Sequence, residues 1–104
     1  MFALVVRFDC RDLAAADRFD ELTAEAVGQI GEREPGTLVY ATHAVEGEPL
    51  ARIFYEVYRD RDAFEAHEAA EHVQLFHARK NPLLVGTRVE FLTPGSATGL
   101  DGPG

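Results

Sequence analysis

The chain has 104 residues, a formal net charge of −8, 46% hydrophobic residues and 27% charged residues. This length and composition predict one globular domain, small enough to gain from burying more surface in a homodimer. The acidic charge argues against a nucleic-acid-binding protein, and no apolar run approaches the roughly 20 residues that cross a bilayer. The chain begins without a basic leader segment, so we expect no membrane partner and a cytoplasmic location.

The first predicted elements are a strand and a long helix. Residues 2–9 are rich in β-branched and aromatic residues, with large side chains at alternate positions, which indicates a strand. Between residues 14 and 33 the apolar residues recur at helical spacing, which is typical of an amphipathic helix that covers a sheet. Asp12 is a suitable N-cap, and the Glu-Pro-Gly segment at 34–36 ends the helix.

The middle of the chain predicts a β-hairpin. Residues 37–45 and 52–58 are both rich in strand-forming residues, and the segment 46–49 between them has the Gly and Pro of a turn. The two strands are therefore expected to pair antiparallel. On the second strand, Phe54 and Glu56 are expected to share one face.

A second helix and a last strand follow the hairpin. An aspartate within the segment 60–62 is expected to cap a helix over about 63–80, which stops before an Asn-Pro pair. We expect this helix to kink or restart around Glu71 and His72. Residues 86–92 then predict the fourth strand.

The order strand, helix, strand, strand, helix, strand predicts an α+β fold, the ferredoxin-like βαββαβ arrangement. Its four-stranded antiparallel sheet would carry both helices on one face and leave the other face open. A second copy of the chain is the simplest cover for this face, so we expect a homodimer through it. The domain is expected to span residues 1–93, and the Gly- and Pro-rich residues 94–104 are expected to form a flexible tail.

The segment His67-Glu68-Ala69-Ala70-Glu71-His72 looks like a zinc-binding helix, in which two histidines stand four residues apart. Here the two histidines are five residues apart, a rotation of about 500° that separates them by about 140° on a straight helix. His77 lies a further five residues along, with the same rotational objection. The spacing therefore predicts no metal site. One face of the helix is expected to carry Phe64, His67 and Glu71.

Polar side chains on otherwise apolar elements are the remaining candidates for a functional site: Tyr40, His43, Tyr55, Glu56, Tyr58, His67, His72 and His77. A polar group on a core element needs a partner or a purpose. Glu56 could pair with Arg7 or Arg88 on neighbouring strands, or it could line a pocket. Tyr40 could simply fill the core. Either histidine could be a satisfied structural residue or a group that accepts a proton.

Four short motifs follow one another along the chain. They are Glu34-Pro35-Gly36-Thr37 followed by Tyr40, Phe54-Tyr55-Glu56-Val57-Tyr58-Arg59-Asp60, Ala63-Phe64-x-x-His67, and Glu71-His72-Val73. Their order and spacing resemble the antibiotic biosynthesis monooxygenase family, which includes small quinol monooxygenases. The resemblance covers about residues 2–93. It implies that the ferredoxin-like domain pairs into a dimeric α/β-barrel.

The resemblance also implies a chemistry. Members of known activity oxidise quinol or polycyclic aromatic substrates with O2 and use no metal, flavin or other cofactor, so the implied partners are a small-molecule substrate and O2. A deprotonated phenol can itself reduce O2, so the protein has to bind, orient and manage protons. The resemblance assigns His67 as the proton acceptor and Tyr40 and His72 as orienting groups. The implied substrate-binding side chains are Glu56, Phe54, Phe64 and His77.

Two other functions stay open within the same fold. An isomerase of the autoinducer-2-processing type would need basic groups in its pocket for a phosphorylated substrate, with Arg7, Arg52 and Arg88 as candidates. A non-catalytic ligand-binding or accessory domain would need no proton acceptor at His67. The chain has no tryptophan, whereas the polyketide-oxidising and heme-degrading branches of the family that it resembles use one. The heme-degrading branch also needs an asparagine on the first strand, where this chain has Arg7 or Phe8, so heme degradation is not expected.

Overall fold

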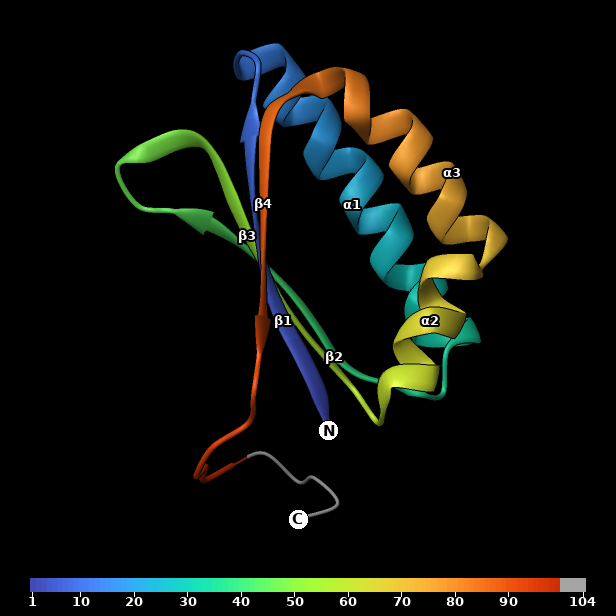
Figure 1. The fold of residues 1–104 in the computed structure, drawn as a ribbon. Coiled ribbons are helices and arrows are strands. Elements are labelled where there is room, and N and C mark those ends of the chain that lie inside the picture. Colours follow the sequence, from blue (N-terminus) through green and yellow to red (C-terminus); the bar gives the residue numbers. More distant parts are fainter. Residues whose placement is uncertain (100–104) are drawn as a thin grey trace.

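The computed structural model describes residues 1–99, which form a four-stranded sheet and three α-helices (Figure 1). The last part of the predicted tail, residues 100–104, lies outside the described residues. In chain order the elements are β1 (Phe2–Cys10), α1 (Leu13–Arg33), β2 (Thr37–Val45), β3 (Glu48–Tyr58), α2 (Arg61–Ala69), α3 (Glu71–Lys80), the short 3-10 helix η1 (Asn81–Leu83) and β4 (Leu84–Leu92). The predicted order is confirmed, with the second helix divided into α2 and α3.

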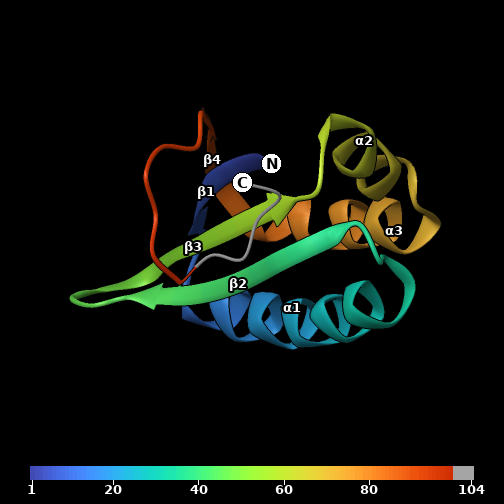
Figure 2. The same cartoon turned by 90° about the horizontal axis from the view of Figure 1, so that it is seen from below.

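The sheet has the strand order β2-β3-β1-β4, and every neighbouring pair is antiparallel. All three helices cover one face of this sheet and leave the other face open (Figures 1 and 2). The predicted ferredoxin-like α+β fold class is therefore confirmed. Within residues 1–99, none of the helices is long and apolar enough to span a membrane.

Aspartate side chains fix where two of the helices begin. Asp12 accepts a hydrogen bond from the backbone N–H of Ala15, and Asp60 accepts one from Ala63, both at 2.8 Å. Each bond satisfies a backbone donor that the first turn of a helix leaves without an intrahelical partner. The cap of α2 is thus Asp60, one of the two aspartates in the predicted segment.

The hairpin is tighter than predicted. The turn is confined to Glu46 and Gly47, and β3 begins at Glu48 instead of Arg52. Gly47 has a φ of 78°, a backbone conformation that glycine adopts without steric penalty. The predicted longer turn is wrong because Pro49 already lies in β3. This position comes before Ala51, where the pairing of β3 with β1 ends, so the missing backbone N–H of proline is tolerated there.

The break in the second helix lies at Ala70, whose ψ of 138° is that of an extended residue. The predicted restart around Glu71 and His72 is confirmed, because α3 begins at Glu71. The prediction that Glu71 shares a helix face with Phe64 and His67 is wrong, because Glu71 begins a new helix after the break and is exposed. The break changes the direction in which the residues after it project.

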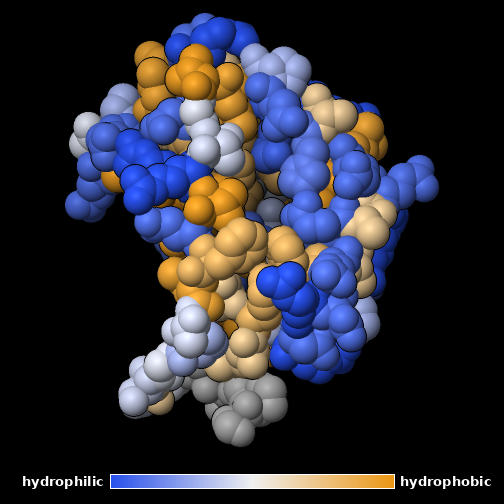
Figure 3. All heavy atoms as spheres, in the orientation of Figure 1, coloured by the Kyte–Doolittle hydropathy of each residue, from blue (hydrophilic) through white to orange (hydrophobic). Residues whose placement is uncertain are grey.

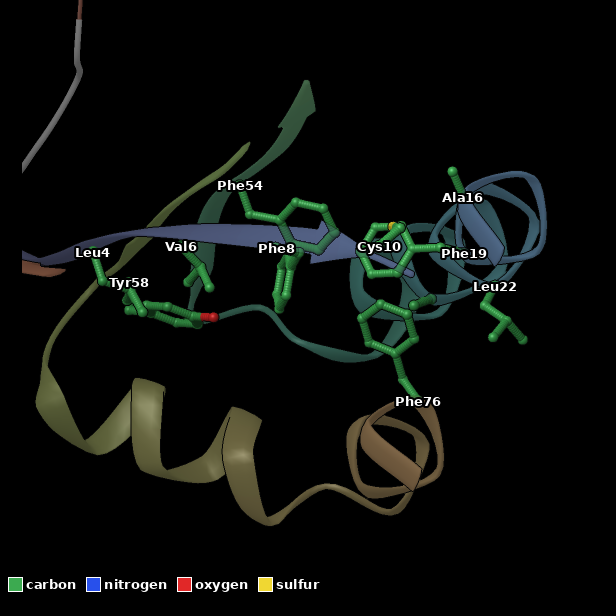
Figure 4. Packing of buried hydrophobic residues seen from close by; sticks show 11 residues of the cluster. Leu4, Val6, Phe8, Cys10, Ala16, Phe19, Leu22, Phe54, Tyr58 and Phe76 are labelled. Atoms are coloured by element: carbon green, nitrogen blue, oxygen red, sulfur yellow. The ribbon is translucent and has the colours of Figure 1, made fainter. Parts of the chain in front are cut away.

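The core lies between the sheet and the helices (Figure 4). Phe8 of β1, Phe19 of α1 and Phe54 of β3 meet with ring centroids 4.7 to 5.8 Å apart, and Phe76 of α3 lies against Phe19. Phe19 and Phe54 have no exposed surface. Fully burying an aromatic side chain contributes about 2–3 kcal/mol, so this cluster joins α1 and α3 to the sheet.

One close approach sets where α2 lies. A Cβ atom placed on Gly36 would stand 2.7 Å from the Cβ of Ala63, closer than two such atoms can pack. Only a glycine at this position allows the start of α2 to lie against the connection between α1 and β2. This contact brings the end of α1 beside α2 and α3.

Candidate active site

A cavity of about 270 Å³ lies between the sheet and the pair α2 and α3. Its apolar wall includes Leu4, Val6 and Phe8 of β1 and Phe91 of β4. Beside it, β4 exposes a band of apolar residues that contrasts with the hydrophilic outer surface of the helices (Figure 3). The polar side chains that line the cavity are Tyr40, Glu56, His67, Glu68, His77 and Lys80. An apolar pocket with a few convergent polar groups is the usual form of a small-molecule site.

Buried polar side chains concentrate at this cavity. Within residues 1–99 the buried polar or charged side chains are Thr23, Glu56, His67 and Lys80, and all but Thr23 line the cavity. Burying an ionisable side chain carries a desolvation penalty. Such penalties gather at sites where a protein binds or transforms a ligand, so the cavity is the candidate active site.

His67 is held by Glu34, whose side chain reaches over from the end of α1. The Nδ1 atom of His67 lies 2.7 Å from Oε1 of Glu34, and the imidazole is 2% exposed. Burial lowers the pKa of His67 and outweighs the opposing effect of Glu34. Burial raises the pKa of Glu34, but hydrogen bonds with Thr37 and His67 reverse this shift and lower the pKa overall. A neutral His67 therefore donates Nδ1–H to the carboxylate and keeps a lone pair on Nε2.

His72 binds the second oxygen of the same carboxylate, with Nε2 2.5 Å from Oε2 of Glu34. It does not line the 270 Å³ cavity. It lies at a shallower surface pocket that Glu34 and His67 also border. The break at Ala70 allows two histidines five positions apart to meet one acid. Within residues 1–99, no three His, Cys, Asp or Glu side chains are arranged to hold a metal ion.

Glu56 lies at the floor of the cavity and is 5% exposed. The hydroxyl of Tyr58 donates a hydrogen bond of 2.6 Å to Oε1 of Glu56. The predicted alternative of pairing with Arg7 or Arg88 is wrong, because both arginines lie on the open face of the sheet. There Arg7 binds Glu48 and Arg88 binds Glu90. Burial raises the pKa of Glu56 to about 7.

A second acid joins the two helices along the cavity. Glu68 of α2 has Oε1 3.9 Å from Nε2 of His67 and Oε2 3.2 Å from Nε2 of His77. The Nζ atom of Lys80 lies 2.7 Å from Nδ1 of His77. The hydrogen bond with His77 lowers the pKa of Glu68, and burial lowers the pKa of Lys80 to about 8.

These contacts form one line of alternating bases and acids, which we name the polar row. Its members, in order, are His72, Glu34, His67, Glu68, His77 and Lys80. Each neighbouring pair in the row joins a basic group to an acidic group, apart from the final contact between His77 and Lys80. The distance of 3.9 Å between His67 and Glu68 is longer than a hydrogen bond. Protons can therefore be held and passed within each part of the row, but not directly across this gap.

The aromatic residues named from the sequence lie at different depths. Tyr40 lines the cavity with its ring centroid 5.5 Å from that of His67, and Phe64 also lines it. Burial raises the pKa of Tyr40 well above its usual value, so the hydroxyl keeps its proton. Phe54 does not line the cavity but lies behind Tyr40, with ring centroids 5.7 Å apart.

Sequence reasoning missed three residues of the site: Glu34, Glu68 and Lys80. Tyr58 was among the polar candidates, and it shares a strand face with Glu56 two positions away. Glu34 was treated only as part of a helix-ending motif, and Glu68 and Lys80 as ordinary charged helix residues. For these three no local pattern indicates burial, since their partners come from other elements.

The arrangement can perform general acid–base chemistry. The Nε2 lone pair of His67 can accept a proton from a hydroxyl in the cavity, and Glu34 fixes the tautomer that makes this possible. The resulting imidazolium would be stabilised by the carboxylates of Glu34 and Glu68 on its two sides. Tyr40 can donate a hydrogen bond beside it.

Comparisons with known proteins agree with this description. The sequence profile of the antibiotic biosynthesis monooxygenase family matches residues 1–79. Similar folds include candidate antibiotic biosynthesis monooxygenases from Caulobacter crescentus (22% identity, 91% of this chain and 90% of that chain, TM-score 0.85) and Bacteroides thetaiotaomicron (21%, 95% and 92%, 0.86). A third, from Nitrosomonas europaea, has 19% identity over 90% of this chain and 98% of that chain, with a TM-score of 0.83. No curated protein sequence matches. At these identities the solved structures show a shared fold.

Proposed function

Because the chain belongs to the antibiotic biosynthesis monooxygenase family, we propose that it is a cofactor-independent monooxygenase that oxidises a quinol or polycyclic aromatic small molecule with O2. Family membership supports a monooxygenase-like function in general terms. The substrate class and the use of O2 are the proposed part. They are supported by a cavity with aromatic and aliphatic walls and a buried proton acceptor.

The observation that carries this proposal is the contact between His67 and Glu34. Within the cavity His67 offers a basic nitrogen beside the ring of Tyr40, and Glu34 holds its other nitrogen. A hydroxyl of an aromatic substrate placed here would give its proton to Nε2 of His67. The phenolate that forms is electron-rich enough to reduce O2 directly.

The oxidation then needs no other reductant. The substrate anion passes an electron pair to O2 and forms a carbon–oxygen bond, which gives a substrate peroxide. The imidazolium of His67 returns its proton to the outer oxygen, which gives a hydroperoxide. The carbon that carries it then loses its hydrogen and forms a C=O bond as the O–O bond breaks, and the outer oxygen leaves as water with these two hydrogens. One oxygen atom stays on the ring, and the substrate supplies all four electrons and the two hydrogens of the water.

The remaining predicted site residues have supporting roles in this proposal. Tyr40 donates a hydrogen bond to the substrate, Phe64 forms part of the aromatic wall, and Phe54 supports Tyr40 from behind. His72 acts from outside the cavity by holding Glu34 in place. Glu56 and His77 line the cavity and would tune the charge of the substrate.

Oxygen consumption tests the proposal directly. Purified protein would be mixed with a panel of hydroquinones and anthrones, and O2 uptake would be followed with an electrode and the product mass measured. We expect incorporation of one oxygen atom from 18O2 and a loss of about 10²–10⁴-fold in rate for His67→Ala. Glu65→Ala, which changes an exposed residue on α2, the helix of His67, is the control. Metal-free protein that consumes no O2 with any compound of the panel would contradict the proposal.

We also propose a homodimer that forms through the open sheet face. There Val5, Ile53 and Tyr55 are only partly buried, and apolar side chains on a sheet gain from a cover. Sedimentation should give twice the chain mass, and Ile53→Asp should shift it to the monomer. Leu75→Asp, which alters an exposed leucine on α3, should leave the dimer intact. A monomeric parent protein would contradict this assembly.

The other two functions receive less support. The three arginines considered for a phosphorylated substrate do not line the cavity: Arg7 and Arg88 are on the open face, and Arg52 binds Asp20. If the protein only binds a ligand and catalyses no reaction, His67→Ala should leave its biological activity unchanged. The cytoplasmic location stays a prediction.

A further inference from the structure

The proposed proton transfer from substrate to His67 makes no use of a buried lysine at one end of the cavity. Lys80 is the last residue of α3, is 5% exposed and lines the cavity. Its Nζ atom lies 5.4 Å from the ring centroid of Phe8 and 5.3 Å from that of Phe76, and both rings line the same cavity. The amine therefore stands at the cavity surface between aromatic walls.

The direct hydrogen-bond partners of this amine are an imidazole and a side-chain amide, and neither is a carboxylate. Nζ donates to Nδ1 of His77 at 2.7 Å and to Oδ1 of Asn81 at 3.3 Å. None of the ion pairs formed among residues 1–99 includes Lys80, and Glu68 reaches it only through the ring of His77. A buried ammonium without a direct anionic partner is unfavourable. An anionic atom of a ligand would complete its environment.

The electrostatic surroundings keep this amine charged near neutral pH. Burial lowers the pKa of Lys80 to about 8, while Glu68 and Glu56 act in the opposite direction. The titratable groups that face it are Glu56 from β3, Glu68 from α2 and His77 on its own helix. At pH 7 most molecules therefore present an ammonium to the cavity.

Lys80 and His67 serve opposite ends of the cavity. Lys80 lies beside Phe8 of β1, whereas Glu56 and Tyr40, next to His67, are level with Leu4 of the same strand. Four residues of strand correspond to about 13 Å. An aromatic ligand with oxygen atoms at both ends could therefore contact both groups.

We infer that Lys80 binds the ionised hydroxyl oxygen of an aromatic ligand, so that the cavity selects phenolates over neutral aromatic molecules of the same shape. This rests on the proposed function and defines its substrate class: phenols acidic enough to ionise in the cavity. A polycyclic quinol long enough to reach both groups, ionised at Lys80 and deprotonated at its second hydroxyl by His67, would carry its highest electron density when O2 arrives. The ammonium would act by charge-assisted hydrogen bonding.

Binding of 4-nitrophenol tests this inference without any oxidation. Its visible absorption reports whether the hydroxyl is ionised, and 4-nitroanisole provides the same ring without an ionisable group. At a pH where free 4-nitrophenol is mostly protonated, we expect the bound form to show the phenolate spectrum. Lys80→Met should weaken its binding about tenfold or more, the loss of one charge-assisted hydrogen bond, and should leave 4-nitroanisole binding within about twofold.

Two further variants make the outcome decisive. Lys80→Arg keeps the charge and should retain the phenolate spectrum, and Arg79→Met removes an exposed charge from the same helix and should change nothing. Lys80→Met is expected to fold, because an apolar side chain of similar length replaces a buried charge, and circular dichroism would verify this. The inference is overturned if Lys80→Met binds nitrophenolate as tightly as the parent, if the bound phenol stays protonated, or if the parent binds neither probe. Absence of O2 uptake would remove the proposed oxidation and leave this binding result standing.

Discussion

The layer between sheet and helices is filled in two different ways. Under α1 this layer is a closed aromatic cluster in which Phe19 and Phe54 have no exposed surface. Under α2 and α3 it is a cavity of about 270 Å³ bordered by buried ionisable groups. α1 is one continuous helix, whereas its counterpart is broken at Ala70. The first region stabilises the fold, whereas the buried ionisable groups of the second carry a desolvation penalty that lowers stability.

The largest expected effect contrasts an aromatic residue from each region. Phe19→Ala should lower the free energy of unfolding by about 3–5 kcal/mol, because it leaves a void in a closed cluster. Phe64→Ala should lose less than half as much, since Phe64 is partly exposed and already borders a hollow. Urea denaturation of both variants provides the measurement. Equal losses would show that the two regions are packed alike.

A change at the cavity floor should increase stability. The pKa of Glu56 is raised from 4.5 to about 7, so the folded state holds this proton more tightly than the unfolded state does. Protonated Glu56 contributes fully to the free energy of unfolding below about pH 4.5. This contribution, up to about 3 kcal/mol, is lost as the pH rises to about 7. Glu56→Gln stays neutral and can still accept from Tyr58, so above pH 7 it should be more stable than the parent by up to that amount.

Urea titrations at pH 4.5 and pH 8 measure this difference. Glu65→Gln, which changes an exposed carboxyl on α2, provides the control for loss of a surface charge. If Glu56→Gln raises the free energy of unfolding by the same amount at both pH values, the pKa of Glu56 is not raised in the folded state.

A third variant tests the clamp on His67. Glu34→Gln keeps the shape but cannot accept from both histidines, so we expect a loss of about 2 kcal/mol at pH 7. The pKa of Glu34 is lowered in the folded state, so this contribution is present above about pH 4.5 and is lost as the pH falls through the folded value. Without the carboxylate the pKa of His67 should fall further, and the acidic limb of the activity profile should move to lower pH.

Thermal unfolding against pH and the pH profile of O2 uptake measure the two effects of Glu34→Gln. Glu32→Gln, an exposed neighbour on α1, should affect neither. An unchanged acidic limb would mean that Glu34 has a structural role only.

The smallest expected effect concerns the two aspartate caps. Asp60→Ala and Asp12→Ala each remove one hydrogen bond of 2.8 Å to a helix N-terminus and should each lower stability by about 1 kcal/mol. Their local effects should differ: hydrogen exchange after Asp60→Ala should quicken in α2, the cavity side, and leave α1 protected. Exchange that quickens equally in both helices would argue that the two regions open together.

The elements of this fold are predictable from local patterns. Each of these patterns acts within a few positions of the structure that it specifies. Examples are the alternating large side chains of residues 2–9, the cap at Asp12, and the proline and glycine after the first helix. The same holds for His67 and Tyr40, which stand out because polar groups on core elements are rare. Errors arise at boundaries, as at Glu48, where a strand begins inside a segment with turn composition.

The partners within the site are not predictable in this way. Glu34 meets His67 and His72 from 33 and 38 residues away in the sequence, and no periodicity links such positions. Lys80 has the composition of a solvent-facing helix end, and only the placement of Phe8 and Phe76 buries it. Local sequence specifies which groups are unusual, and the packing of separate elements decides what they touch.

The contact between Gly36 and Ala63 carries a consequence for the history of the site. Because a Cβ on Gly36 would stand 2.7 Å from that of Ala63, Gly36 cannot gain a side chain while Ala63 stays as it is and α2 keeps its place. Descendants of this sequence should therefore keep this glycine, or replace it only where Ala63 has become glycine. A glycine that touches no substrate would then record, across a lineage, whether the contact of Glu34 with its histidines has been kept.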